Sequence, residues 1–149
     1  MGYRLSILAL AIVVLTACAS GGLGTALPTP TDVAIIPPGS DLAPELAAFS
    51  GTWEGVWDGV LPSRLIVERI DATSARVVYM WGAAPDGSFQ AGWGRYNARV
   101  LPGGKIEGFG GAGDPHFVFT MSKDRTSLAG EREHQARINT TTMKKVGQP

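Results

Sequence analysis

The stretch GTWEGVWDG, residues 51–59, opens the part of the chain that is predicted to fold. Trp53 and Trp57 are four residues apart, and side chains alternate along an extended strand, so both rings are predicted to lie on one face. The three glycines of the stretch permit sharp bending and close backbone approach. This combination is typical of a first strand that curls into a closed barrel.

Eight short runs are predicted as strands from residue 51 onward. Polar and apolar residues alternate in several of them; Val77, Tyr79 and Trp81, for example, share one face. Turn residues separate the runs, including Leu61-Pro62. We therefore predict an all-β fold, an eight-stranded antiparallel up-and-down barrel that closes to remove its edges. The expected strands are 51–58, 63–70, 73–81, 92–101, 104–110, 115–122, 126–134 and 136–146.

Composition narrows the classes of function. The 149 residues carry 13 Lys and Arg against 13 Asp and Glu, so the formal net charge is zero. Nucleic-acid binding normally requires a basic patch or stripe, and no nucleic-acid partner is predicted. Cys18 is the only cysteine, which excludes an intrachain disulfide.

The N-terminal residues 1–17 are predicted to be a signal peptide. Arg4 precedes an apolar run that is too short to span a bilayer, and small residues then lead to Cys18. Leu15-Thr16-Ala17-Cys18 closely resembles the lipobox of bacterial lipoproteins. The resemblance implies lipidation of Cys18 and membrane anchoring in the bacterial cell envelope. Because residue 19 is Ala rather than Asp, it further implies the periplasmic face of the outer membrane. The alternative is an ordinary secretory signal with an incidental cysteine.

Residues 18–39 are predicted to be the lipid anchor and a disordered linker, because they are rich in Gly, Ser, Thr and Pro. Residues 33–36 are an apolar exception that could dock on the domain. The barrel domain is assigned to 40–149, with a short helical turn over 40–49 that could plug one end.

Gly51-Thr52-Trp53 resembles the G-x-W signature of the calycin superfamily, which includes lipocalins, fatty-acid-binding proteins and avidins. The resemblance implies that Trp53 closes one end of the barrel and that a basic residue of the last strand, here Arg137, lies across its ring. The chain departs from avidins at Gly55, where they carry a polar residue, so biotin binding is not predicted.

Aromatic side chains are the candidates for contact with a ligand. The alternative is a packed apolar core, because an eight-stranded barrel only just leaves room for a small molecule. The candidate ligand-binding residues are Trp57, Tyr79, Trp81, Phe117 and Phe119.

No catalytic residue, cofactor or metal site is predicted. His116 and His134 are the only histidines, and a metal site needs three or four converging ligands. A nucleophile elbow of the form G-x-S-x-G does not occur in the sequence. The leading hypothesis is a non-enzymatic lipoprotein whose barrel binds a small apolar or amphipathic ligand. The alternative is a structural or protein-interaction module of the envelope, with a partner that the sequence does not name.

Overall fold

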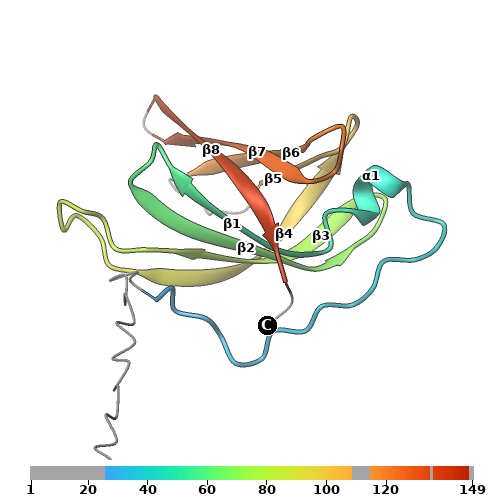
Figure 1. The fold of residues 1–149 in the computed structure, drawn as a ribbon, viewed down its shortest axis with the longest axis horizontal. Coiled ribbons are helices and arrows are strands. Elements are labelled where there is room, and N and C mark those ends of the chain that lie inside the picture. The colour runs from blue at the N-terminus through green and yellow to red at the C-terminus, as the bar shows by residue number, and fades with distance from the viewer. Residues whose placement is uncertain (1–25, 109–114, 135, 148–149) are drawn as a thin grey trace, which may run out of the picture.

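The computed structural model describes residues 26–108, 115–134 and 136–147. The predicted signal peptide and Cys18 lie outside the described residues. From Gly51 the chain forms eight strands that follow one another around a closed barrel (Figure 1). The strands are β1 (Gly51–Trp57), β2 (Leu61–Ile70), β3 (Ser74–Trp81), β4 (Gly92–Leu101), β5 (Lys105–Gly108), β6 (His116–Met121), β7 (Ser127–His134) and β8 (Arg137–Val146).

Every neighbouring pair of strands is antiparallel, and β1 pairs with β8 to close the barrel. The predicted fold class is therefore confirmed. The largest difference in a boundary is at β2: Leu61 and Pro62 belong to this strand rather than to a turn, since Pro62 lies opposite Val56. A proline is tolerated there because it stands beside the start of the strand. The other predicted strand boundaries that fall on described residues agree within one residue. Among the described residues, no helix is long and apolar enough to cross a membrane.

The two ends of the barrel differ. The helix end carries α1 (Pro44–Ala47) and the connections 71–73, 102–104 and 122–126. The loop end carries the connections 58–60 and 82–91, together with the end of β7 and the start of β8. Leu42 before α1 and Leu46 within it pack on the barrel core, and Phe49 after it is fully buried. The predicted helical turn therefore covers one end of the barrel, and the loop end has no such cover from the described helix.

Small residues make room for large ones inside the barrel. A Cβ atom added at Gly130 would lie 2.8 Å from Cε1 of Phe119 and 2.7 Å from Cγ2 of Thr141. One added at Gly55 would lie 2.9 Å from Cγ of Met143. Real Cβ atoms do not approach other atoms so closely, so these inward positions accept only glycine without rearrangement. Interdigitation of this kind is how a small barrel fills its interior with side chains.

Residues 26–39, which we call the strap, run along the outside of β2 and β3 (Figure 1). Ile66, Val78 and Met80 point outward, yet each is at most 2% exposed. They are covered by Leu27, Val33 and Ile35 of the strap. The expected docking of residues 33–36 is therefore confirmed, and the packed segment is longer than predicted, because it includes Leu27 as well. The outer face of β2 and β3 is apolar and needs a cover.

A polar cluster also holds the strap. Glu68, at an irregularity in the pairing of β2 with β3, is only 5% exposed. Its carboxylate accepts hydrogen bonds from Arg95 at 3.0 and 3.2 Å, and Nε of Arg76 lies 3.3 Å from it. The same Arg95 guanidinium donates two 3.0 Å hydrogen bonds to Asp32 of the strap. The Ile36 amide donates to the Glu68 carbonyl at 2.7 Å. The strap is thus joined to the barrel by both apolar and charged contacts.

Candidate functional site

An aromatic cluster occupies the interior of the barrel toward the loop end. Its members are the five residues that the sequence singled out as ligand candidates. Phe117 is central, with its ring centroid 4.9 Å from that of Tyr79, 5.8 Å from that of Trp57 and 6.3 Å from that of Phe119. Trp81 extends the cluster by stacking on Tyr79 at 6.1 Å. Alternation placed all five on inward faces, and the closed barrel brings them together.

The cluster is graded in depth. Trp57 and Phe119 are at most 1% exposed, Tyr79 is 3% and Phe117 6% exposed, and Trp81 is only half-buried. Trp81 is therefore the ring of the cluster nearest to solvent, and Trp57 and Phe119 are the most deeply buried. Trp57 and Phe119 also serve as core, because protein atoms already cover them.

One polar contact is buried within the cluster. The indole N–H of Trp57 donates a 2.7 Å hydrogen bond to the hydroxyl oxygen of Tyr79. Burial raises the pKa of Tyr79 to about 12, so its hydroxyl remains protonated and neutral at physiological pH. The bond satisfies the indole donor, which would otherwise carry the cost of an unpaired buried polar group.

Arg132 adds a positive charge to the aromatic cluster. It lies on β7 in phase with the buried Leu128 and Gly130, and its guanidinium carbon is 5.7 Å from the centre of the Trp57 ring. Its Nη2 donates a 2.8 Å hydrogen bond to Oδ1 of Asn139. Among the described residues no carboxylate forms an ion pair with Arg132. Its direct contacts among the described residues are thus a side-chain amide and a π-face, and the nearby Asp58 carboxylate interacts with it only at longer range.

Asp58, in the turn after β1, orients the side chain of Asn139 toward Arg132. Its carboxylate accepts a 2.9 Å hydrogen bond from the Thr140 amide and another from the side-chain amide of Asn139. The Thr140 amide and then the Asn139 amide lower the pKa of Asp58 below its ordinary value. Since Asn139 donates to Asp58, its oxygen is turned toward Arg132. A chain of three side chains thus runs from the turn after β1 to the guanidinium above Trp57.

Sequence reasoning missed Arg132, Asn139 and Asp58. Strand phase carried a signal for Arg132, since it follows Leu128 and Gly130 on the inward face. No signal in the sequence shows that Asp58 and Asn139 meet, because 81 residues separate them.

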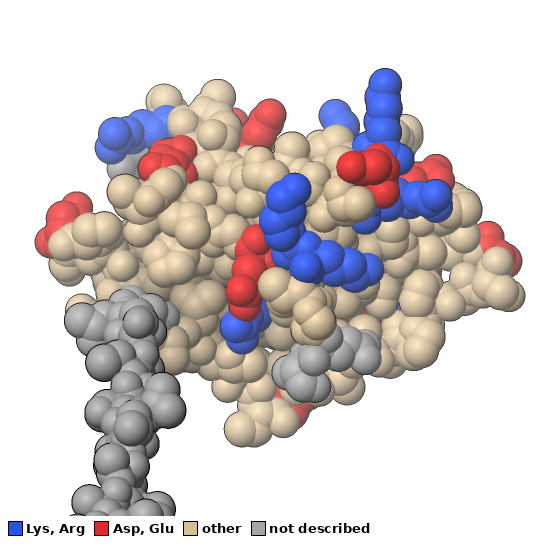
Figure 2. Space-filling model, viewed as in Figure 1, with Lys and Arg blue, Asp and Glu red and all other residues tan. Residues whose placement is uncertain are grey.

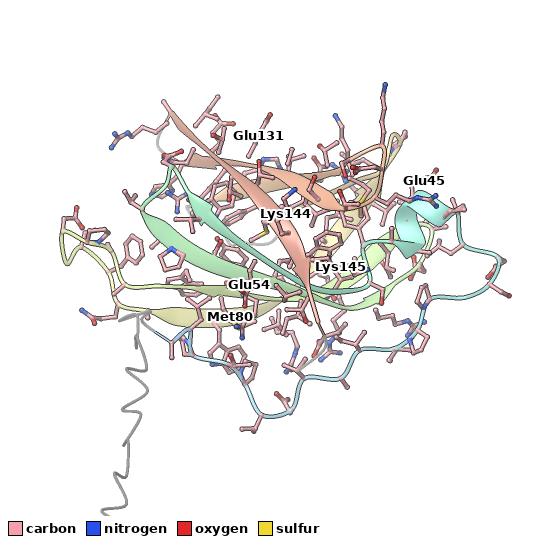
Figure 3. The ribbon with its side chains drawn as sticks, viewed as in Figure 1. Glu45, Glu54, Met80, Glu131, Lys144 and Lys145 are labelled. Carbon is pink, nitrogen blue, oxygen red and sulfur yellow. The ribbon has the colours of Figure 1, made fainter. Side chains whose placement is uncertain are left out.

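The predicted partner of Trp53 is corrected by the register of β8. Trp53 lies opposite Lys145, whose Nζ is 5.1 Å from the ring centre and donates a 3.0 Å hydrogen bond to the Ala48 carbonyl. Lys145 lies on the part of β8 near α1 (Figure 3), and burial lowers its pKa. Arg137 instead pairs with His134 at the loop end and is exposed. Arg137 and Lys145 are eight positions apart and lie on the same face of β8. Side-chain alternation alone therefore did not show which of them contacts Trp53.

The histidines do not converge on a common site. His116 contacts Glu107 at 3.7 Å, and His134 lies on β7 opposite Arg137. Within the described ranges, no group of three or more His, Cys, Asp or Glu residues is arranged to hold a metal ion.

No protein-family model matches the sequence, and no curated protein matches it significantly.

Proposed function

We propose that this protein is a lipid-anchored lipoprotein of the bacterial envelope whose barrel binds a small amphipathic molecule at the loop end. The observation that carries the binding proposal is Arg132, a guanidinium that forms no direct ion pair among the described residues and lies beside an aromatic cluster. The lipobox-like sequence before Cys18 supports the anchor, and the periplasmic face of the outer membrane is the proposed location.

The chemistry of the site favours a ligand with two parts. Aromatic rings bind an apolar chain or a flat ring system without regard to direction. A guanidinium binds a carboxylate or another anionic head with charge-assisted hydrogen bonds, and its fork geometry fixes the orientation. Trp81 and Phe117 would contact the apolar body, and Arg132 would bind the head group. Binding does not require a reaction, and none is proposed.

Replacing Arg132 by Gln tests this assignment. The probe is a fluorescent medium-chain fatty acid, and its uncharged methyl ester serves as the reference ligand. Losing a hydrogen bond to a charged group costs about 1.5–3 kcal/mol, so affinity for the acid is expected to fall about 10- to 100-fold. Affinity for the ester should change little. Titration of the detergent-solubilised protein by probe fluorescence measures both.

Arg137→Gln is the matched control, because Arg137 is an exposed arginine at the same end of the barrel. It should bind the acid as the unchanged protein does. Equal losses in the two variants would show general electrostatic attraction and contradict the role of Arg132. Failure of the unchanged protein to bind either probe, together with no co-purifying small molecule in native mass spectrometry, would refute the ligand proposal.

Replacing Cys18 by Ala tests the anchor separately. Without a thiol, no lipid can be attached, so the protein is expected to lose the mass of the acyl groups and to leave the membrane fraction. Metabolic labelling with a radioactive or clickable fatty acid, followed by fractionation, measures both effects. Membrane association that does not change in this variant would contradict the anchor, because a non-lipidated chain would then be held by other contacts.

A further inference from the structure

Exposed apolar side chains are concentrated at one end of the barrel. Among the described residues, the large hydrophobic side chains that remain exposed are Ile36, Val56, Val60, Phe89, Trp93 and Ile138. All except Ile36 lie at or next to the loop end. On the face shown in Figure 2, the visible Lys and Arg side chains lie mainly over the middle of the barrel and toward the helix end. We call Val60, Phe89, Trp93 and Ile138 the apolar rim.

The rim surrounds the loop end rather than forming a patch on one side. Ile138 is on β8 and Trp93 is on β4, and these strands are on opposite sides of the closed eight-stranded barrel. Val60 and Phe89 lie in the two connections, with exposed fractions of 61% and 40%. A ring of separated apolar groups around one end matches a flat, laterally extended partner. A compact protein partner would instead favour one contiguous patch.

The strap determines where the N-terminal tether leaves the barrel. Thr29 contacts the sulfur of Met80 at 3.6 Å and accepts a hydrogen bond from Arg64 at 3.3 Å. Met80 is the last residue but one of β3, so the start of the strap lies near the loop end, as its blue start shows in Figure 1. Ile36 contacts Glu68 further along β2, and the chain then continues to α1. The strap therefore runs from the loop end to the helix end.

The length of the tether restricts the orientation of the barrel. Seven residues lie between Cys18 and Ala26, and the eight Cα–Cα steps from one to the other span at most about 29 Å when fully extended. A ten-residue strand is about 33 Å long, or about 25 Å along the axis of a tilted barrel. With the helix end on the membrane, the tether would have to be almost fully extended beside the barrel. With the loop end on the membrane, a short and relaxed tether suffices.

We propose that the apolar rim docks on the surface of the lipid bilayer, so that the aromatic cluster and Arg132 open toward the membrane. This inference rests on the proposed lipid anchor at Cys18, and it extends the proposed function by making the membrane the source of the ligand. Trp is suited to the boundary between head groups and acyl chains, because its ring is apolar and carries one polar N–H. Phe adds apolar area on the membrane-facing side. The lipid anchor supplies the affinity, and the rim supplies the orientation.

Depth-dependent quenching in vesicles tests the orientation. The full lipidated chain is reconstituted in vesicles of phosphatidylethanolamine and phosphatidylglycerol that contain a nitroxide-bearing lipid. A fluorophore is attached either to Ser88→Cys, in the loop-end connection, or to Ala72→Cys, in an exposed turn of the helix end. We expect several-fold stronger quenching at position 88 than at position 72. Equal quenching at the two positions, or stronger quenching at position 72, would overturn the proposed docking.

A rim variant and a matched control separate docking from anchoring. Phe89→Ser with Ile138→Ser should reduce the difference in quenching between positions 88 and 72. Ile36→Ser removes an equally exposed apolar side chain outside the rim, and should preserve the difference. If the rim variant kept the full difference, the rim would not orient the barrel and the inference would be wrong. In the chain without added cysteines, Cys18 is the only residue that could carry a thiol. If the fluorophore labelled that chain, Cys18 would be unmodified, and the lipid anchor itself would be contradicted.

Discussion

Replacement of Trp53 by alanine is expected to lower the free energy of unfolding by about 3–5 kcal/mol. The side chain is 0% exposed, and its indole N–H donates a 2.8 Å hydrogen bond to the Phe49 carbonyl. Removing it leaves a large cavity at the helix end and separates the segment after α1 from β1. It also removes the ring beneath the Lys145 ammonium. Urea denaturation followed by circular dichroism measures the change.

Two variants determine the cause of this loss. Trp93→Ala deletes the same side chain from a position that is 43% exposed, where the ring centre lies 6.0 Å from the Arg95 guanidinium carbon, and should cost only about 1 kcal/mol. Trp53→Phe retains an apolar ring but removes the hydrogen bond, and should fall between the alanine variant and the unchanged protein. A Trp53→Ala variant as stable as Trp93→Ala would show that the helix end does not depend on this ring.

Replacement of Arg95 by alanine is expected to destabilise the protein by about 2–3 kcal/mol and to release the strap. Removing one partner of a buried ion pair costs about 3–5 kcal/mol in general, and the expected value is smaller here because Arg76 remains in contact with Glu68. The variant also loses both hydrogen bonds to Asp32. Amide hydrogen exchange at Ile36, which bonds to the Glu68 carbonyl, should become faster.

Arg99→Ala is the control for this change. Arg99 pairs with the mostly buried Glu107, but its own side chain is 72% exposed and it does not touch the strap cluster, so its loss should cost less than that of Arg95, about 1 kcal/mol, and leave strap exchange unchanged. Acidification provides a second measurement. The hydrogen bond from Arg95 lowers the pKa of Asp32, so this contact contributes fully above the ordinary carboxyl pKa and is lost as the pH falls through the lowered value. If amide hydrogen exchange in the strap were as slow in Arg95→Ala as in the unchanged protein, apolar contacts alone would hold the strap.

Local patterns in the sequence were sufficient to predict most of the fold. Strand alternation and turn residues located all eight strands, because a period of two reports directly which face of a strand is buried. The same alternation placed the five aromatic residues on inward faces, so their gathering followed from closure of the barrel. Pro62 shows the limit of this reasoning, because a proline beside a leucine indicated a turn where the chain had already entered β2.

Long-range register was not accessible to local reasoning. Arg137 and Lys145 occupy the same face of β8, and only the pairing of β8 with β1 decides that Lys145 lies over Trp53. Arg132 was inward by phase, but its hydrogen bond to Asn139 and the contact of Asn139 with Asp58 depend on how β7, β8 and the first turn meet. The strap, apart from residues 33–36, was predicted to be part of a disordered linker, because a segment rich in Pro, Gly and Thr favours neither a helix nor a buried strand.

The sequence by itself determined the all-β class, the order of the strands and the inward position of Trp53 and Trp57 in residues 51–59. These properties depend on residues only a few positions apart, because side chains alternate between the two faces of a strand and turn residues end it. Only the tertiary structure decided the partner of Trp53, the charge beside Trp57 and the course of the strap. Those contacts join residues from 32 positions apart, as in Ile36 and Glu68, to 92 positions apart, as in Trp53 and Lys145. Their geometry is set by barrel closure and by apolar surfaces that need a cover.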